Sequence, residues 1–218
     1  MSRATAIAMV SGGLDSLVAL ALAVRDLDIR LVLYFDYGHR ARESERASAM
    51  AAANFYGLEF REVNLAWLGD LSPGGMRRDG EVSALTSVDD VWIPNRNGLF
   101  ISVAAAFAEA YGCGAVVCGF NREEAAEFPD NSADFVSRST AALQLSTRNA
   151  VAVRSDTIDM DKREILRAGA DAGAPLSIIW SCYHSAQRMC GRCASCLRLK
   201  AALASLADDE RPVLEFES

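Results

Sequence analysis

The sequence is short of positive charge, of histidine and of long hydrophobic runs. Its 22 lysines and arginines are outnumbered by 29 aspartates and glutamates, which gives a formal net charge of −7. Proteins that bind along a nucleic-acid backbone usually carry a stripe of basic residues. The excess of acidic residues disfavours such a stripe, so we expect no nucleic-acid partner. No stretch reaches the ~20 apolar residues needed to span a bilayer. We therefore expect no membrane partner, no targeting segment at the amino end and a cytoplasmic location.

The composition is that of a folded protein. Hydrophobic residues make up 51% of the 218 residues and charged residues 23%, which excludes disordered and fibrous classes. This length fits one domain, or one domain with a small appendage. The chain has six cysteines. Since we expect it in the cytoplasm, these cysteines are more typical of free thiols or metal ligands than of disulfides.

Short apolar runs alternate with longer segments of helical periodicity. The predicted strands are residues 4–10, 29–35, 59–65, 115–119 and 150–154, and the predicted helices are residues 15–27, 42–56, 97–111, 132–145 and 161–172. Buried strands that alternate with helices form parallel sheets, so we predict an α/β, Rossmann-like fold with a five-stranded parallel sheet and helices on both faces. Ligands of such sheets bind at the carboxyl ends of the strands. Residues 69–92 lack periodicity and are interpreted as a long loop, a type of segment that often serves as a lid.

The strongest nucleotide-binding signal follows the first predicted strand and opens the first predicted helix. It is the string Ser11-Gly12-Gly13-Leu14-Asp15-Ser16. Adjacent glycines let the backbone approach a ligand closely, and the N–H groups at a helix start bind phosphate without a lysine. The two serine hydroxyls add donors, and the aspartate fits a Mg²⁺ ion placed between its carboxylate and the phosphates. The string lacks the Gly-Lys-Ser/Thr ending of a Walker loop, and it does not match the Gly-x-Gly-x-x-Gly pattern of dinucleotide-binding loops.

A second signal lies near the carboxyl end, where four cysteines have the spacing C-x7-C-x2-C-x2-C. They are Cys182, Cys190, Cys193 and Cys196. Four thiolates at such spacing can close a tetrahedral shell around zinc, and a closed shell leaves no open position, so we predict a structural zinc ion. The other two cysteines, Cys113 and Cys118, are interpreted as small core residues.

The six-residue string resembles the pyrophosphate loop of the PP-loop ATP pyrophosphatases, the adenine nucleotide alpha hydrolase-like superfamily, which cut ATP between its α- and β-phosphates. In combination with the four cysteines, the chain resembles the 7-cyano-7-deazaguanine synthase family of the queuosine and archaeosine pathways. The resemblance covers almost the whole chain and includes residues 35–38, 94, 96–97, 119, 121, 129–130, 158–165, 180–183 and 190–196.

The resemblance implies a HUP-like PP-loop domain over residues 1–176 and a zinc-binding subdomain over residues 177–218. It implies a ligase that uses ATP and Mg²⁺ to adenylate the carboxylate of 7-carboxy-7-deazaguanine. Ammonia then displaces AMP to give an amide, and a second adenylation with loss of AMP gives the nitrile. The resemblance also implies a homodimer.

The resemblance further assigns roles to individual residues. It implies catalytic roles for Asp15, Arg96 and Lys162. Adenylation builds negative charge on the α-phosphate oxygens, which the two cations Arg96 and Lys162 can stabilise, whereas Asp15 fits the Mg²⁺ ion. The ATP and pyrophosphate residues that it implies are Ser11, Gly12, Gly13, Leu14, Asp15, Ser16, Phe35, Asp36, Gly119 and Lys162. The substrate residues that it implies are Arg96, Asn97, Asn121, Phe128 and Asp130.

Some positions depart from the family pattern, among them Glu124, residues 127–132 and residues 184–186. They keep open a second function, in which a paralogue adenylates the same carboxylate but passes the acyl group to another amine, for example on a protein in a modification or defence system. An RNA-modifying PP-loop enzyme and a non-catalytic zinc-stabilised binding module are further alternatives. His39 and His184, the two histidines, are candidates for a general base or for polar surface and supporting roles.

Overall fold

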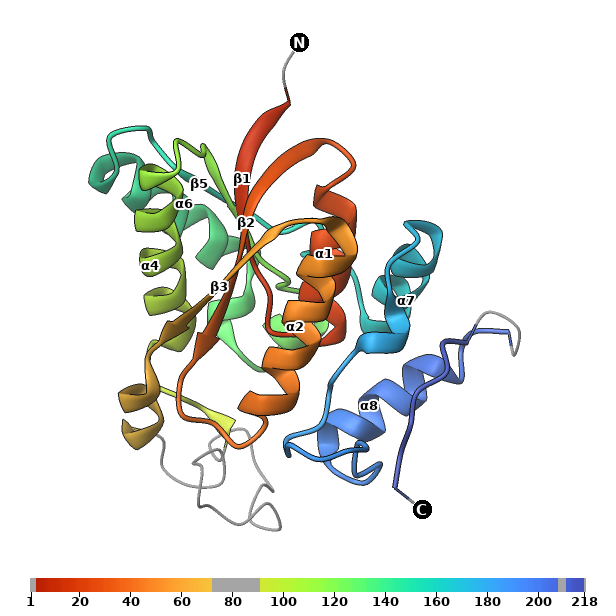
Figure 1. Cartoon of the computed structure of the whole chain (residues 1–218). Coiled ribbons are helices and arrows are strands. Elements are labelled where there is room, and N and C mark those ends of the chain that lie inside the picture. The colour runs from red at the N-terminus through yellow and green to blue at the C-terminus, as the bar shows by residue number, and fades with distance from the viewer. Residues whose placement is uncertain (1–2, 72–90, 208–210, 218) are drawn as a thin grey trace.

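A five-stranded parallel sheet forms the centre of the molecule (Figure 1), with the strand order β3-β2-β1-β4-β5. The computed structural model describes residues 3–71, 91–207 and 211–217. The strands are β1 (Ala4–Met9), β2 (Leu27–Asp36), β3 (Glu59–Asn64), β4 (Ala115–Val117) and β5 (Ala152–Arg154). The predicted α/β class and the predicted five-stranded parallel sheet are confirmed.

Helices cover both faces of the sheet (Figure 1). One face carries α1 (Leu14–Ala23), α2 (Arg42–Tyr56) and α7 (Lys162–Asp171), and the other carries α4 (Arg96–Ala110) and α6 (Ala133–Ser146). Shorter elements are η1 (Ala66–Leu71), α5 (Arg122–Ala125), η3 (Pro129–Asn131) and η4 (Leu176–Ile178). None of the helices within residues 3–71, 91–207 and 211–217 has the length and apolar character to cross a membrane.

The apolar runs of the central strands follow from burial on both faces. In β2, Val32 and Tyr34 belong to the core beneath α1 and α2, whereas Leu31 and Leu33 belong to the core beneath α4. Successive side chains of a strand point to opposite faces, so a strand covered on both sides must be apolar at every position. The edge strand β3, by contrast, has no fully buried residue.

Two predicted elements differ from the observed ones. The first helix ends at Ala23 rather than at residue 27, because Leu27 already pairs with Ala4 as the first residue of β2. Residues 69–71, predicted as loop, lie in the 3-10 helix η1. The remainder of that predicted loop, residues 72–90, lies outside the described residues, and so does the prediction of a lid there.

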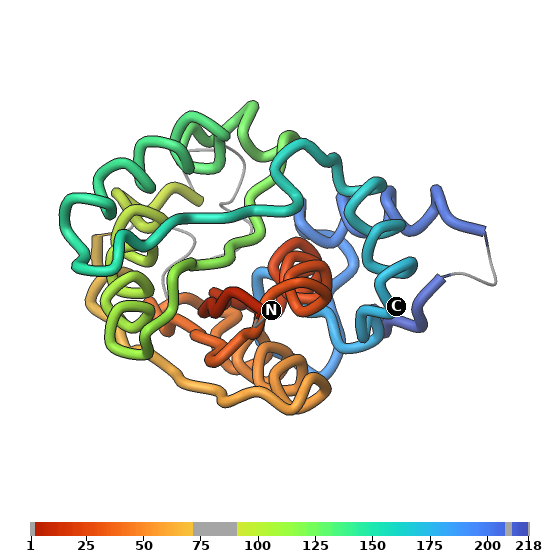
Figure 2. Tube along the Cα trace, turned by 90° about the horizontal axis from the view of Figure 1, so that it is seen from above, coloured from red at the N-terminus to blue at the C-terminus, as the bar shows by residue number. Residues whose placement is uncertain are grey.

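The carboxyl-terminal segment, which contains the helix α8 (Ala194–Leu203), packs beside α1 and α7 (Figure 2). Its residues Met189 and Leu199 share one hydrophobic core with Leu17 of α1 and Ile165 of α7. The segment is therefore anchored to the same face of the sheet as the first helix. The domain boundary between residues 176 and 177 stays a prediction.

The sheet has its switch point between β1 and β4, since the chain continues from β1 to β2 on one side and reaches β4 on the other. Crevices for ligands form at such points, beyond the carboxyl ends of the strands. Here the turn after β4 lies directly against the start of α1. A Cβ atom on Gly119 would lie 2.5 Å from the Ser16 nitrogen, so this crossing leaves no room for a side chain.

We predict that Gly119→Ala lowers the free energy of unfolding by about 1–3 kcal/mol, because the added methyl group has backbone on its contact side. Urea unfolding measures the change. Gly114→Ala is the matched control, since a Cβ atom there meets nothing within 4 Å. Equal stability of the two variants would contradict the close contact.

Candidate active site

The phosphate loop, residues 11–16, leads from β1 into the first turn of α1 and is closed by hydrogen bonds among its own residues. The Ser16 hydroxyl accepts from the Ser11 nitrogen at 3.1 Å and donates to the Gly13 carbonyl oxygen at 3.2 Å. The Ser11 hydroxyl accepts from the Gly13 nitrogen at 3.3 Å. The first backbone N–H groups of α1 have no acceptor within the helix, so they are available to an anion.

Gly12 holds this loop against two other parts of the chain. Its carbonyl oxygen accepts hydrogen bonds from the Ser48 hydroxyl of α2 at 2.8 Å and from the Trp180 nitrogen at 3.0 Å. Its φ of +86° suits glycine, and a Cβ atom would lie 2.5 Å from the carbonyl oxygen of Glu45. The loop is thus fixed between α2 and the segment that leads into the cysteine cluster.

Lys162 lies between two carboxylates at the start of α7. Its Nζ atom forms ion pairs with Asp15 of the loop and, at 2.7 Å, with Glu124 of α5. A capping box stabilises the helix start: the Asp161 side chain accepts from the Glu164 backbone nitrogen, and the Glu164 side chain accepts from the Asp161 backbone nitrogen. The lysine is therefore held at the loop by charge, from a rigid helix end.

Burial controls the protonation of this cluster. It raises the pKa of Asp15 from 3.8 to about 6, and the attraction of Lys162 works in the opposite direction. Burial also acts to lower the pKa of Lys162, but the two carboxylates outweigh it and raise that pKa. The Oδ1 atom of Asp15 is buried and has no hydrogen-bond partner among the described residues. Such an oxygen is a suitable ligand for Mg²⁺.

Two neighbouring cavities meet at Lys162. The first, of about 270 Å³, lies at the loop, and we call it the nucleotide cavity. The second, of about 170 Å³, lies beyond the lysine, and we call it the second cavity. Both are lined by Leu14, Arg96, Glu124, Asn131, Lys162, Ser181, Tyr183 and Ser195. A group in one cavity can therefore reach a group in the other beside the lysine.

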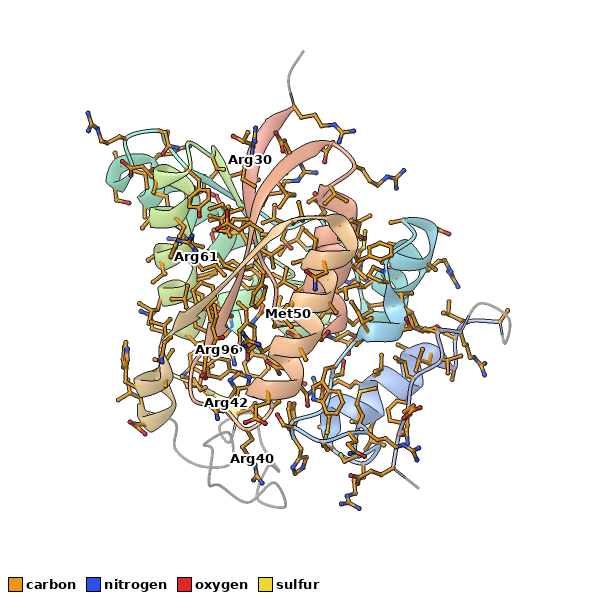
Figure 3. The ribbon with its side chains drawn as sticks, viewed as in Figure 1. Arg30, Arg40, Arg42, Met50, Arg61 and Arg96 are labelled. Atoms are coloured by element: carbon orange, nitrogen blue, oxygen red, sulfur yellow. The ribbon has the colours of Figure 1, made fainter. Side chains whose placement is uncertain are left out.

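The second cavity combines planar rings with charges. The rings of Trp92 and Phe128 are parallel to within 2°, with their centroids 6.2 Å apart. Arg96 lies at the carboxyl end of the strands, opposite the end that carries Arg30 (Figure 3), with its guanidinium 5.4 Å from the Tyr37 ring centroid. Burial raises the pKa of Asp130, and Arg96 acts to lower it. This cavity suits a flat, polar, charged molecule.

The structure brings most of the predicted site residues to these cavities. Phe35, Gly119 and five residues of the loop line the nucleotide cavity, Asn97 lines it beside Arg96, and Phe128 and Asp130 line the second cavity. Their roles in binding stay predictions.

Within the part of the chain that the structure describes, three predicted residues, Gly12, Asp36 and Asn121, do not line either cavity. Gly12 holds the loop through its carbonyl oxygen, as described above. The Asp36 carboxylate accepts from the Gly38 nitrogen at 2.9 Å, and Asn121 accepts from the Glu124 nitrogen at 2.9 Å as the cap of α5. Both therefore shape the loops around the cavities, and their contact with ligands stays a prediction.

The two histidines have supporting contacts. His39 is fully buried, lies 2.8 Å from the Glu45 carboxylate and stacks on Tyr37 with ring centroids 3.8 Å apart. The carbonyl oxygen of His184 accepts from the Trp180 indole at 2.9 Å, and burial lowers the pKa of the His184 ring. Neither histidine is among the cavity-lining residues that the structure describes.

Sequence reasoning missed several lining residues: Trp92, Glu124, Ser181, Tyr183, Ser195 and Arg198. Four of them lie within two residues of a cysteine of the predicted zinc cluster. Their proximity to those cysteines could have identified them as site residues, because the cysteine cluster lies at the edge of the site.

The four clustered cysteines fit a zinc ion. Their sulfur atoms all lie within 4.8 Å of one another. Backbone N–H groups donate to the sulfurs of Cys182 and Cys190 at 3.4 and 3.3 Å and so help to fix these two sulfurs in position. Four sulfurs complete a tetrahedral shell, so the donor set suits a structural zinc ion. Cys113 and Cys118 are buried in the core, as predicted.

The cysteine segment also caps α2. That helix begins after Ala41, whose methyl group cannot accept a hydrogen bond. The Ser185 hydroxyl instead accepts from the Glu43 and Ser44 nitrogens at 3.2 and 3.3 Å. One of the departures from the family pattern thus has a structural role, because it satisfies the free donors of a helix start.

We predict that Asp15 titrates near pH 6 and that Lys162→Met moves its pKa further upward, since the lysine acts to lower it. The folded chain holds this proton at a higher pH than the unfolded chain. The protonated carboxyl therefore stabilises the fold fully below about pH 4, and this contribution is lost as the pH rises through about 6. Carboxyl ¹³C NMR measures the titration, with Asp15→Asn for assignment. Exposed Arg167→Gln on the same helix is the control, and an ordinary pKa in the wild type would contradict the prediction.

We predict that Cys196→Ser abolishes zinc binding and weakens ATP binding about tenfold, because the contacts of Trp180 and Ser185 with the loop and α2 are then lost. Metal analysis and calorimetry with ATP measure the two effects. Cys113→Ala, outside the cluster, should keep the zinc ion. Unchanged ATP affinity in a zinc-free Cys196→Ser chain would contradict the coupling.

Comparisons with known proteins identify the family of the chain. The family model described as "Queuosine biosynthesis protein QueC" matches residues 5–207. The 7-cyano-7-deazaguanine synthase of Pelotomaculum thermopropionicum is 45% identical over 205 residues, which cover 88% of this chain and 93% of that protein. The same enzyme of Carboxydothermus hydrogenoformans is 43% identical over 208 residues, which cover 90% and 97%.

A solved structure shows the same fold at low identity. NMN synthetase from Francisella tularensis is 15% identical, with a TM-score of 0.50, and the match covers 100% of this chain and 90% of that one. The family match and the two synthases cover nearly the whole length of the chain. The chain therefore belongs to the QueC family of queuosine biosynthesis proteins, the family of the 7-cyano-7-deazaguanine synthases.

Proposed function

We propose that the chain is an ATP-dependent, AMP-forming ligase that converts 7-carboxy-7-deazaguanine and ammonia into 7-cyano-7-deazaguanine. The observation that carries this proposal is the position of Lys162, where the nucleotide cavity meets the second cavity. A cation at this junction can neutralise charge on the α-phosphate while a carboxylate approaches from the other side. The names of the relatives at 43–45% identity support the choice of substrate.

On the ATP side, the N–H groups at the start of α1 and the hydroxyls of Ser11 and Ser16 hold the β- and γ-phosphates. The adenine ring lies beside Phe35, which lines the same cavity. The buried Oδ1 atom of Asp15 would hold Mg²⁺ with the phosphates, and the ion would supply positive charge to the departing pyrophosphate. These contacts hold the leaving group and leave the α-phosphorus open to attack.

On the substrate side, the second cavity takes the deazaguanine ring against the parallel rings of Trp92 and Phe128. The carboxylate of Asp130 accepts hydrogen bonds from the ring N–H and the exocyclic amino group, which lie on one edge of the base. Arg96 lies between this edge and the junction with the nucleotide cavity. The base is thereby oriented with its carboxylate toward Lys162.

In the first step a substrate carboxylate oxygen bonds to the α-phosphorus, the bond to the β-phosphate oxygen breaks, and pyrophosphate leaves. Lys162 and Arg96 face the charge that develops on the α-phosphate oxygens. Ammonia then bonds to the acyl carbon, loses a proton, and AMP leaves with the electrons of the C–O bond. In the second cycle the amide oxygen bonds to the α-phosphorus of a second ATP, the bond to the β-phosphate oxygen breaks, and pyrophosphate leaves again. Loss of AMP and of the two amide protons leaves the nitrile.

The resemblance also implies a homodimer, which light scattering would measure. The protein-modifying paralogue and the RNA-modifying enzyme are other outcomes of the activity test. AMP formation without nitrile would favour the first, and tight, salt-sensitive binding of tRNA would favour the second.

We predict that the wild-type chain with ATP, Mg²⁺, ammonia and 7-carboxy-7-deazaguanine forms AMP and the nitrile, detected by mass spectrometry. Lys162→Gln should lower kcat by roughly 100-fold or more, because one preorganised cation is lost from the transition state. Arg167→Gln, exposed on the same helix, is the control and should keep full activity. Absence of AMP with the wild-type chain would refute the proposed function.

A further inference from the structure

Helix α8 presents one face to the second cavity. Ser195, Arg198 and Leu199 line that cavity and are spaced at i, i+3 and i+4, so they lie side by side on the helix. The helix is capped by Cys193 and contains Cys196, two members of the cysteine cluster. The cluster therefore fixes both the position and the rotation of this face.

The charged residues that line the second cavity carry one excess positive charge, since Asp15 and Glu127, which pair with two of them, do not line it. Arg96, Lys162 and Arg198 line it, against the carboxylates of Glu124 and Asp130. A molecule with a single negative charge would balance this set, and such balance favours its binding over that of a neutral analogue.

The three cations differ in how closely they are already paired. Lys162 is held by two carboxylates, with the Glu124 oxygen at 2.7 Å. Arg96 lies over the ring of Tyr37 and is buried among acidic groups that include Asp130.

Arg198 is less tightly paired with carboxylates than Lys162, and its side chain also hydrogen-bonds to the Tyr183 side chain. The nearest ion pair recorded for it is with Glu127, at 3.8 Å, and that glutamate does not line the cavity. The Arg198 side chain is 35% exposed. Unlike Lys162, its guanidinium can turn to an incoming carboxylate without breaking a short ion pair, and unlike Arg96 it lies over no described aromatic ring of the nucleotide cavity.

We propose that Arg198 receives the carboxylate of the acid substrate in the second cavity and so selects the acid over neutral deazaguanines. This role rests on the proposed function. The guanidinium matches a carboxylate with two parallel hydrogen bonds, which an amide or nitrile group cannot accept in the same way. The four-cysteine cluster thus holds the carboxyl-terminal segment in place and also fixes the helix that carries the substrate-recognition residue Arg198.

The amide intermediate of the reaction provides the test, because it has the same ring as the acid and no charge. Calorimetry without ATP measures the binding of both compounds to the full-length, zinc-loaded chain. The wild type should bind the acid at least tenfold more tightly than the amide. Arg198→Gln should weaken acid binding about tenfold or more, in line with the loss of a charge-assisted hydrogen-bond pair, and change amide binding less than threefold.

Two further variants and a metal analysis complete the test. Arg198→Lys should fall between wild type and Arg198→Gln, because it keeps the charge but loses the paired donors. Arg188→Gln, an exposed arginine of the same segment, should behave as wild type. Zinc content of each variant shows whether the cluster is intact. If Arg198→Gln loses its zinc, the acid preference of the wild type and the result with Arg198→Lys decide the question.

Equal losses for acid and amide would overturn the proposal, since Arg198 would then contact the ring. Unchanged binding of the acid, or a wild type that binds acid and amide equally, would also overturn it, while the proposed function would stand on nitrile formation. A wild type that binds neither compound and forms no AMP would refute the proposed function and this role with it.

Discussion

The carbonyl oxygen of Gly12 is the point on which the site depends. It takes one hydrogen bond from α2 and one from the backbone of Trp180, and the crowding at its Cα excludes any side chain. A phosphate loop binds through backbone N–H groups, whose directions follow from the φ and ψ angles of a few residues. Fixing one carbonyl from two sides therefore sets the orientation of the whole loop. The geometry of anion binding is built in before any ligand arrives.

The charged groups around Lys162 are also held in place before a ligand binds. A buried lysine without partners would lose its proton, and two buried carboxylates without a cation would repel each other. Placed together, Asp15, Lys162 and Glu124 keep the lysine charged and extended toward the junction of the cavities. Phosphate oxygens can replace these carboxylates as partners, so the resting contacts resemble those that the reaction requires. When ATP binds, Lys162 exchanges carboxylate partners for phosphate oxygens, and its own charge and position stay the same.

Much of this could be predicted from the sequence, because the signals are local. The apolar runs of β1 and β2 follow from burial on both faces, and the phosphate loop and the cysteine spacing are each contained in one short segment. The contributions of Glu124 and Arg198 could not be predicted, since they depend on how α5 and α8 cross the sheet edge. Asp36 shows the converse. It is the last residue of β2, at the ligand edge of the sheet, yet its carboxylate contacts the Gly38 backbone and Arg42.

The cap that Ser185 places on α2 has a consequence for biosynthesis. The phosphate loop and α2 leave the ribosome early, whereas their partners emerge much later, since Ser185 lies 142 residues after Glu43. Until then the start of α2 lacks its acceptor and Gly12 lacks one of its two donors. We expect the nascent polypeptide to form its sheet first and to gain nucleotide affinity last, so that a truncated product would be folded in part but inert toward ATP.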